Sequence, residues 1–451
     1  MADHMEYRLA LLLPESRQVL GFQGFGADEL PRISIPRWER PAEQLTKLVE
    51  EMWHVKSVVL DVLIDASSPT PFAIMEVRKR SSELERGGLR PVQPDDISNA
   101  SLGEKERHAV ASILSNNADD RGPFARIGWV GEVQEWIQRE VHSRDIRFSE
   151  DILQFNAGGG FSLVRFDTQQ GSAYWLKAVG NPNEHEFRVT TTLATLFKSY
   201  LPPIVAVRPE WNAWVMEDAG QPLSNSFDLP SVEKAVTCLA ELQGKSVDCI
   251  ETLLAAGCPD CSIPVLADHL RALTEYLGDA MNRQTSTKAP RLEIQRLREL
   301  ESIVRDACLA MQDLRVPDAL IHNDINGGNI LLCGSRCVFT DWAEACIGNP
   351  FLTFQHLCAQ VSLDSRDAEA WLPCVRSAYK RSWREWLTES QIDQAFVLMP
   401  ILAIASYLYG RGAWLNSPIR ETPHFQSYSR SLARHMDRAA RAPELLEALC
   451  R

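Results

Sequence analysis

The sequence predicts an α+β protein in three parts: a small α+β domain over residues 1–148, a β-rich lobe over residues 149–219 and a helical region over residues 220–451. Strand-like and helix-like runs alternate up to about residue 148, apolar strands broken by glycines follow, and helical periodicity dominates from about Gly220 onward. A chain of 451 residues with 45% hydrophobic content is long enough for two or three domains with substantial cores.

The first part alternates strands with two helices, which favours a small α+β domain. The predicted strands cover residues 7–13, 19–22, 58–64 and 72–77, and the predicted helices cover residues 40–54 and 102–114. We interpret the polar stretch 116–122 and the following residues 123–129 as the exit from this domain. Residues 133–141 then predict an amphipathic helix that could bridge to the next part.

The second part opens with two strands joined by a glycine turn, over residues 152–166, and a third strand follows at residues 172–179. Gly158, Gly159 and Gly160 would let backbone amides approach phosphate oxygens closely. An ordinary hairpin turn would use these glycines too.

One lysine, Lys177, lies in the apolar third strand. An ammonium group without a partner is costly there, so Lys177 needs an anionic side chain beside it. Glu186, at the start of a helix-like stretch, and Glu184 are the two candidates, and we prefer Glu186.

The segment 320–342 carries the polar pattern that points to chemistry. Asp324 is followed five residues later by Asn329 and twelve residues after that by Asp341. The runs 330–332 and 337–339 flank the turn-like residues 334–336, so a hairpin is expected to bring both ligands to one end.

This spacing suits phosphoryl transfer. Such a site needs a carboxylate within reach of the acceptor hydroxyl, and hard oxygen ligands that hold Mg²⁺ against the phosphates. Asp324 fits the role of base, and Asn329 and Asp341 fit the role of metal ligands. We also expect Gly327 and Gly328 to allow unusual backbone angles in this loop.

The segment resembles the catalytic loop and metal-binding segment of the aminoglycoside phosphotransferase and choline kinase group of kinase-like enzymes. The resemblance covers roughly residues 149–360 and implies a bilobal, protein-kinase-like fold, ATP and Mg²⁺. It implies that His322 braces the loop through hydrogen bonds. Asn323 stands where the family usually has glycine, a mild departure because asparagine also tolerates left-handed backbone angles.

The same resemblance assigns the nucleotide-binding residues. The glycine turn with Ser162 would cover the phosphates, and Glu186 would pair with Lys177. Met216, Glu217 and Asp218 would form the hinge that hydrogen-bonds the adenine through the backbone, although an ordinary strand end would look alike.

The acceptor is expected to be a small molecule with a hydroxyl group. Gly348 comes only seven residues after Asp341, which leaves no room for the long activation segment of a protein kinase. Trp342 and Glu344 could touch the acceptor. An aminoglycoside, a sugar, an amino sugar and an amino alcohol all remain open, as do ATP against GTP and the oligomeric state.

Composition restricts the partners and the compartment. The net charge of −13 disfavours nucleic acid. The longest apolar stretch, near residues 399–409, is too short and polar to span a bilayer, and no cleaved leader is evident. Eleven cysteines without framework spacing favour reduced thiols, and we expect a cytoplasmic protein.

Two alternative functions remain open. The chain could be a non-catalytic, kinase-like module that senses a ligand, although no metal ligand or lysine is lost. Residues 1–148 resemble a Nudix fold in element order, which would imply a nucleotide pyrophosphatase. However, Thr46, Lys47 and Trp53 replace residues that the family's catalytic helix needs, so Glu50 and Glu51 more simply form a solvated helix face.

Overall fold

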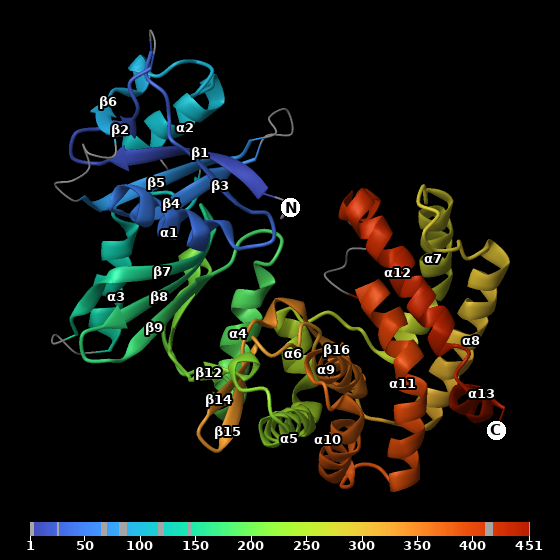
Figure 1. Cartoon of the computed structure of the whole chain (residues 1–451). Helices are drawn as coiled ribbons and strands as arrows, with labels where there is room; N and C mark the ends of the chain where they lie inside the picture. Colours follow the sequence, from blue (N-terminus) through green and yellow to red (C-terminus); the bar gives the residue numbers. More distant parts are fainter. Residues whose placement is uncertain are drawn as a thin grey trace. The chain divides into compact units, whose positions relative to one another are not determined.

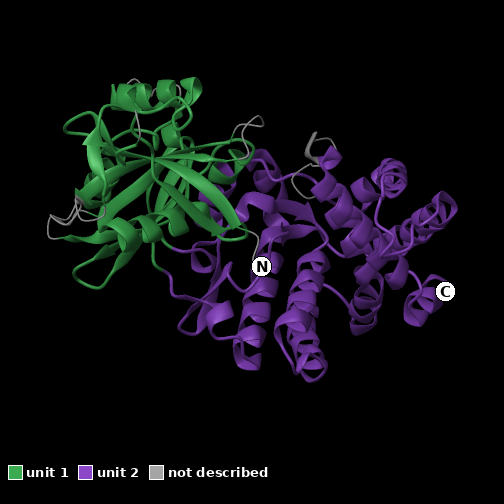
Figure 2. Cartoon of the chain, turned by 45° about the horizontal axis from the view of Figure 1, so that its top comes forward, with its two compact units in different colours: residues 1–187, 203–218 green, residues 188–202, 219–451 purple. Residues whose placement is uncertain are grey.

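The computed structural model describes residues 4–24, 27–64, 70–80, 88–115, 121–141, 146–410 and 418–450 (Figure 1). Two compact units divide the chain (Figure 2): unit 1 comprises residues 1–187 and 203–218, and unit 2 comprises residues 188–202 and 219–451. The predicted α+β class is confirmed. Unit 1 joins residues 1–148 with most of the predicted β-rich lobe, and the finer division at residue 148 stays a prediction.

Unit 1 contains a six-stranded sheet in the order β4-β5-β1-β2-β6, with β3 paired to β1. Its strands are β1 (His4–Leu13), β2 (Gln18–Gly21), β3 (Arg32–Pro36), β4 (Val55–Leu63), β5 (Phe72–Arg80) and β6 (Arg90–Val92). β1 runs parallel to β5, and the other pairs are antiparallel. Four of these strands were predicted. The short β3 and β6 were not, because each spans only three to five residues around proline.

Helices cover both faces of this sheet. They are α1 (Pro41–Trp53), α2 (Glu104–Leu114) and α3 (Trp129–Glu140). On β1, Leu9 and Leu11 pack in one cluster with α1, whereas Ala10 and Leu12 pack in another with α2 and α3. Burial on both sides explains why β1 reads as a continuous apolar run.

A second, five-stranded antiparallel sheet in unit 1 has the order β10-β11-β9-β8-β7. Its strands are β7 (Phe148–Gly158), β8 (Phe161–Thr168), β9 (Ala173–Ala178), β10 (Ile204–Arg208) and β11 (Ala213–Glu217). Val164, Phe166 and Leu176 of this sheet lie in the same buried cluster as Leu12 and Val133. The two sheets of unit 1 therefore share one apolar core.

Unit 2 is mostly helical. Its helices are α5 (Leu229–Ser246), α6 (Ile250–Ala256), α7 (Ile263–Asn282), α8 (Ile294–Asp313), α9 (Phe351–Asp364), α10 (Ala368–Trp383), α11 (Glu389–Gly410), α12 (Pro423–Ala439) and α13 (Pro443–Leu449). Helix α4 (His185–Leu196) begins in unit 1 and ends in unit 2. Two small sheets, β12-β14-β15 and β13-β16, lie among the helices and share their core. Their strands are β12 (Gln221–Pro222), β13 (Ala319–His322), β14 (Ile330–Cys333), β15 (Arg336–Phe339) and β16 (Ala345–Gly348).

Helix α11 includes the apolar stretch near residues 399–409. It begins at Glu389, so Pro400 lies inside the helix. By length and composition residues 389–409 could cross a membrane, a test that the core helix of a soluble protein also passes, and 56% of the tested window is buried. Ile392, Leu398 and Leu402 belong to the core of unit 2.

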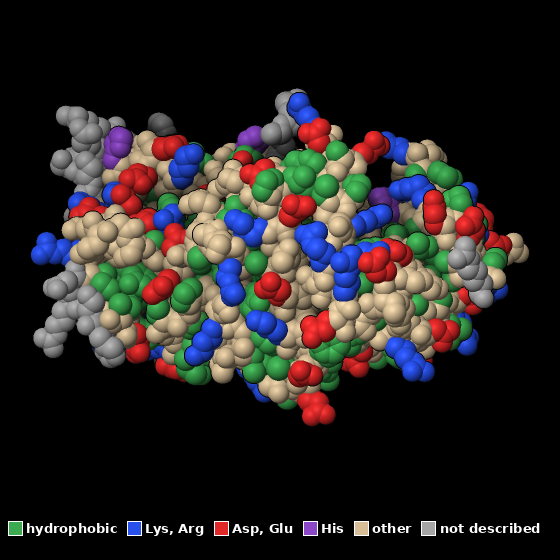
Figure 3. All heavy atoms as spheres, turned by 90° about the horizontal axis from the view of Figure 1, so that it is seen from below, with side chains coloured by type: hydrophobic (Ala, Val, Ile, Leu, Met, Phe, Trp, Pro, Cys, Tyr) green, Lys and Arg blue, Asp and Glu red, His purple; other side chains and the backbone are tan. Residues whose placement is uncertain are grey.

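Side chains of both charges share the surface. On the face drawn in Figure 3, lysines and arginines are interspersed with aspartates and glutamates. On α1, Glu50 and Glu51 are exposed, as the solvated-face interpretation predicted. Among the residues that the structure describes, no group of three His, Cys, Asp or Glu side chains could hold a metal ion.

Candidate active site

The segment with the polar pattern folds as two strand pairs in unit 2. β13 (Ala319–His322) pairs with β16 (Ala345–Gly348), and β14 (Ile330–Cys333) pairs with β15 (Arg336–Phe339). The predicted hairpin is thereby confirmed, with its turn at Gly334, where φ is +56°. Asp324 and Asn329 lie on the loop between β13 and β14, and Asp341 follows β15 closely.

Asn329 holds Asp324 directly. Its Nδ2 donates to the backbone oxygen of Asp324 at 2.8 Å and to the carboxylate Oδ2 at 3.2 Å. The carboxylate of Asp324 is only partly buried, so it keeps access to solvent. A partly exposed carboxylate fixed by an amide donor can accept a proton from a hydroxyl group placed beside it.

His322 connects the loop to the strand end before Asp341. Its Nε2 lies 2.8 Å from the backbone oxygen of Thr340, and its ring lies 4.5 Å from that of Trp342. Thr340 N in turn donates to Asn329 O at 3.0 Å. His322 is 2% exposed, a position that suits the bracing role implied by the resemblance.

Asp341 has a left-handed backbone, with φ +65° and ψ 68°. Aspartate adopts this conformation at some energetic cost, and such residues persist only where the surroundings impose them. Thr340, immediately before Asp341, is bonded to both His322 and Asn329. These bonds restrict the backbone on the N-terminal side of the predicted metal ligand.

Three positions of this loop have no left-handed backbone angles. Asn323 does not use a left-handed conformation, and its amide instead donates to Cys346 Sγ at 3.1 Å. Gly327 and Gly328 also lack positive φ values. Gly327 is packed closely, because an added Cβ would lie 3.1 Å from Ser224 N, and Ser224 N donates to Gly327 O.

The donor atoms suit Mg²⁺. Because Nδ2 of Asn329 is turned toward Asp324, its amide oxygen lies on the other side and is the atom that would face a cation. Asp341 supplies a carboxylate. One amide oxygen and one carboxylate are the few hard ligands that Mg²⁺ takes from a protein when phosphates and waters complete its shell.

In unit 1, Lys177 and Glu186 form a buried ion pair. Lys177 Nζ lies 2.5 Å from Glu186 Oε1, and the two side chains are 15% and 2% exposed. Lys177 is on β9, opposite Trp214 of β11, and Glu186 lies in the first turn of α4. The structure thus pairs Lys177 with the preferred candidate and not with Glu184.

The glycine turn joins β7 to β8, with Gly158 opposite Phe161. None of Gly158, Gly159 and Gly160 has a positive φ. An added Cβ would lie 2.3 Å from the Phe161 ring at Gly158 and 1.7 Å from Arg121 O at Gly159, but would meet nothing within 4 Å at Gly160. The hydroxyl of Ser162 is 3.4 Å from Asn156 O, and Ser162 is 2% exposed. Its side chain is therefore occupied inside the hairpin.

At the predicted hinge, two backbone amides are already used within unit 1. Glu217 N donates to Pro203 O at 2.9 Å, and Asp218 N donates to Ala173 O at 3.0 Å. Asp218 also pairs with Arg165 at 3.3 Å. An adenine at this strand end would have to use other backbone groups of residues 216–218, such as their carbonyls.

The two predicted acceptor contacts differ in accessibility. Trp342 is 1% exposed, and its Nε1 donates to Phe339 O at 3.2 Å. Its side chain therefore packs in the core instead of meeting an acceptor. Glu344 ends the same short 3-10 helix (Trp342–Glu344) and is partly exposed, so its predicted contact stays a prediction.

Two residues of the loop were missed by sequence reasoning. Asn326 donates to Asp324 O at 3.2 Å and accepts from Gly328 N at 2.8 Å, and Thr340 links His322 to Asn329. The dipeptide Asn326-Gly327 is a turn signal that could have identified the first of them. No pattern singles out Thr340, because a backbone carbonyl makes its contact with His322.

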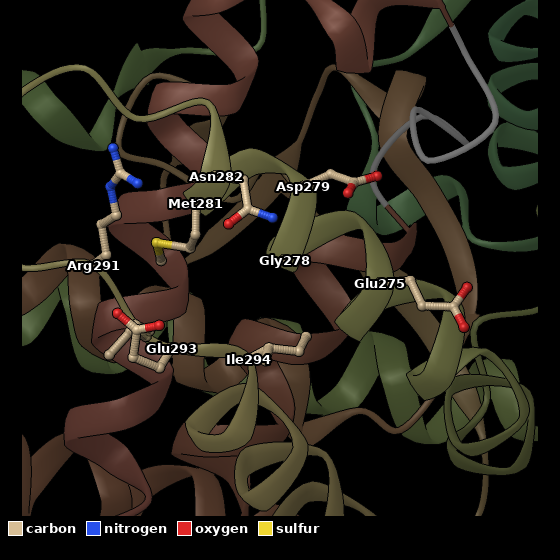
Figure 4. A pocket seen from close by; sticks show the side chains of 9 residues that line it. Glu275, Gly278, Asp279, Met281, Asn282, Arg291, Glu293 and Ile294 are labelled. Carbon is tan, nitrogen blue, oxygen red and sulfur yellow. The ribbon is translucent and has the colours of Figure 1, made fainter.

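A cavity of about 520 Å³ lies elsewhere in unit 2 (Figure 4), where α7, α8 and the segment between them meet. Glu275, Asp279, Arg291 and Glu293 are among its lining residues. Asp324, Asn329 and Asp341 do not line it, so the cavity is separate from the predicted base and metal ligands.

Comparison with protein families identifies part of the chain. Residues 233–387 match the model described as the phosphotransferase enzyme family. The match includes Asp324, Asn329 and Asp341. It confirms, over these residues, the resemblance drawn from the sequence and the predicted class of enzyme, a small-molecule kinase. None of the curated proteins matches the chain.

Several solved structures are similar to the chain. A choline/ethanolamine kinase family protein from Mesorhizobium loti has a TM-score of 0.46 at 14% identity, covering 71% of this chain and 98% of its own. An ethanolamine kinase from Plasmodium vivax has a TM-score of 0.45 at 13% identity, and the match covers 77% of this chain and 97% of that kinase. A choline kinase from Streptococcus pneumoniae has a TM-score of 0.41 at 14% identity, and the match covers 71% of this chain and 99% of that kinase.

Proposed function

We propose that this protein transfers the γ-phosphoryl group of ATP to a hydroxyl group of a small molecule, such as an aminoglycoside, a sugar, an amino sugar or an amino alcohol. The observation that carries the proposal is the set of bonds around Asp324, in which Asn329 fixes the carboxylate and His322 fixes the strand end before Asp341. In this arrangement Asp324 would be the base, and Asn329 and Asp341, which flank the β14–β15 hairpin, would be the two oxygen ligands.

Each side chain has a distinct task in the proposal. Asp324 accepts the proton of the acceptor hydroxyl as the oxygen attacks phosphorus, and Asn329 keeps the carboxylate in place. Lys177, oriented by Glu186, contacts nucleotide phosphates. Mg²⁺, held by Asn329 and Asp341, would neutralise charge on the phosphates. His322 stays a bracing group and transfers no proton.

The identity of the acceptor is tested by screening candidate compounds. A panel of antibiotics, sugars, amino sugars and amino alcohols, each offered with ATP and with GTP, should contain at least one compound that stimulates release of the nucleoside diphosphate. Asp324→Asn should bind the nucleotide with an unchanged Kd but lower transfer on the order of 10³-fold, because the proton acceptor is lost.

A matched control is Asp313→Asn, at the exposed end of α8, which should leave turnover unchanged. Unchanged turnover in Asp324→Asn would refute the role of Asp324. Failure of the wild-type chain to bind either nucleotide would refute the proposed function itself.

A further inference from the structure

One segment of unit 1 lies in direct contact with the glycine turn. The backbone N–H of Phe124 donates to the carbonyl oxygen of Gly159 at 3.1 Å. A Cβ added to Gly122 would lie 2.3 Å from that oxygen, and a Cβ added to Gly159 would lie 1.7 Å from the carbonyl oxygen of Arg121. We call residues 121–125 the bracing segment. It belongs to the predicted exit from the first domain, of which residues 116–120 lie outside the described residues.

The bracing segment is itself firmly anchored. The Arg121 guanidinium lies 3.1 Å from the Asp61 carboxylate on β4, and the two side chains are 24% and 17% exposed. Phe124 is 1% exposed, with ring centroids 5.3 Å from Trp129 and 5.6 Å from Trp211. A buried aromatic ring and a largely buried ion pair give this short loop little freedom to move.

The strand that leads to the turn is anchored in the same way. Gln154 of β7 accepts from Val59 N at 2.7 Å and donates to Val59 O at 2.8 Å, and Gln154 is 2% exposed. β4 therefore holds both the bracing segment, through Asp61, and β7, through Val59. The first sheet of unit 1 therefore supports the glycine turn through two sets of contacts, one to the bracing segment and one to β7.

A fixed carbonyl also fixes the amide next to it. The peptide between Gly159 and Gly160 is planar and trans, so its N–H points away from its C=O. With Gly159 O directed at Phe124, the N–H of Gly160 points away from the bracing segment. Gly180 approaches the next carbonyl closely, because a Cβ there would lie 3.0 Å from Gly160 O. The bond from Phe124 thus defines the orientation of the Gly159–Gly160 peptide.

We propose that the bracing segment is a positioning element for nucleotide binding: the Phe124 amide, with Gly122 beside it, orients the Gly159–Gly160 peptide so that the Gly160 N–H can donate to a phosphate oxygen. This inference rests on the proposed function and adds to it a role for residues before residue 149. Backbone amides presented by a rigid turn bind phosphate without first having to be ordered.

The test substitutes two glycines with similar backbones. Gly122 has φ +93° and Gly171, in the turn between β8 and β9, has φ +86°, but a Cβ on Gly171 would meet nothing within 4 Å. Gly122→Ala and Gly171→Ala therefore carry comparable backbone strain, and only the first pushes on Gly159. Affinities for Mg·ATP and for adenosine, which lacks phosphates, are measured by calorimetry in both full-length variants.

We expect Gly122→Ala to weaken Mg·ATP binding on the order of 10-fold, about the effect of one lost hydrogen bond to a charged group, with adenosine affinity unchanged. Gly171→Ala should match the wild type with both ligands. Equal ATP-to-adenosine affinity ratios in the two variants would overturn the inference while leaving the proposed function intact. A wild-type chain that binds no nucleotide would overturn both.

If Gly122→Ala does not fold, Asp61→Asn is the second variant. It weakens the anchor of the bracing segment through Arg121 without adding an atom beside Gly159. The same loss of Mg·ATP affinity relative to adenosine, roughly threefold for a weakened ion pair, would support the role. An unchanged ratio in Asp61→Asn would reject it.

Discussion

Two groups of candidate residues, one in each unit, are built from contacts over very different distances along the chain. In unit 2, His322, Asp324, Asn329 and Thr340 hold one another within a stretch of about twenty residues. In unit 1, the glycine turn is positioned by Asp61, Arg121 and Phe124, which precede it by 35 to 98 residues. A group of residues held by local contacts appears as a spaced motif, whereas a group held by distant segments leaves no motif.

The largest effect that tests this contrast is expected at Lys177. Lys177→Ala leaves Glu186, which is 2% exposed, without its lysine, and removing one partner of a buried pair costs about 3–5 kcal/mol. Loss of the cation should also lower kcat/KM on the order of 10²–10³-fold. Thermal unfolding and nucleoside diphosphate release measure the two effects separately.

The double variant Lys177→Met with Glu186→Gln separates stability from function. Without either charge it should recover most of the lost Tm but none of the activity. If activity returned with the Tm, Lys177 would be a structural residue only, and its proposed contact with nucleotide phosphates would be refuted.

Asn329 tests whether the polar residues around Asp324 in unit 2 act as one assembly. Asn329→Ala removes both donations to Asp324 and one oxygen ligand, so kcat should fall on the order of 10²-fold and half-saturation with Mg²⁺ should rise roughly 10-fold. Asn323→Ala is the control, because that amide lies in the same loop but contacts Cys346. Similar losses in both variants would mean that the loop merely needs to be intact.

His322 should have a smaller effect. His322→Phe keeps a ring beside Trp342 and removes the contact to Thr340 O, so kcat should fall roughly 5- to 10-fold, as expected for one hydrogen bond. The pH–rate profile should keep its shape, because a bracing residue does not titrate in the reaction. A lost acidic limb would instead make His322 a proton-transfer group.

The smallest effect concerns stability in unit 2. Burial, followed by the charge of Asp260, raises the pKa of Asp318, just before β13, from 3.8 to about 6. Because the folded-state pKa is raised, the ionised carboxylate disfavours folding. This cost is absent below pH 3.8, grows between pH 3.8 and pH 6, and is constant above pH 6. Asp318→Asn should therefore add ~1 kcal/mol at pH 7, or about 2–4 °C in Tm, and much less at pH 4.

The control for this prediction is Asp306→Asn, an exposed position on α8. A stabilisation by Asp318→Asn that is equal at pH 4 and pH 7 would show that the amide acts through a new contact rather than through the lost charge.

The same contrast explains how much the sequence could predict. The β14–β15 hairpin, the Lys177 strand and the helices α1 and α2 were predicted because periodicity and glycine breaks act over a few residues. The pairing of Lys177 with Glu186 also followed, since both lie near each other in the chain. Trp342 was misplaced because an aromatic residue beside a metal ligand looks the same whether it faces a substrate or the core.

What could not be predicted depends on contacts between distant segments. The buried Gln154, bonded to Val59, looks like any polar residue of a half-exposed strand. Gly122 looks like a loop glycine, and only the position of Gly159 shows why a side chain is excluded there. Nothing in the local pattern of residues 121–125 indicates that they touch the turn.

The shared apolar core of unit 1 restricts how this chain could have arisen or could be re-engineered. Leu12, Val133 and Phe166 lie in one buried cluster. A recombination point near residue 148 would therefore separate side chains that pack against one another in this core. Grafting a different leading domain onto the remainder would expose that surface to water. The first 148 residues are therefore not an exchangeable attachment, and gene fusions that replace them should yield insoluble protein.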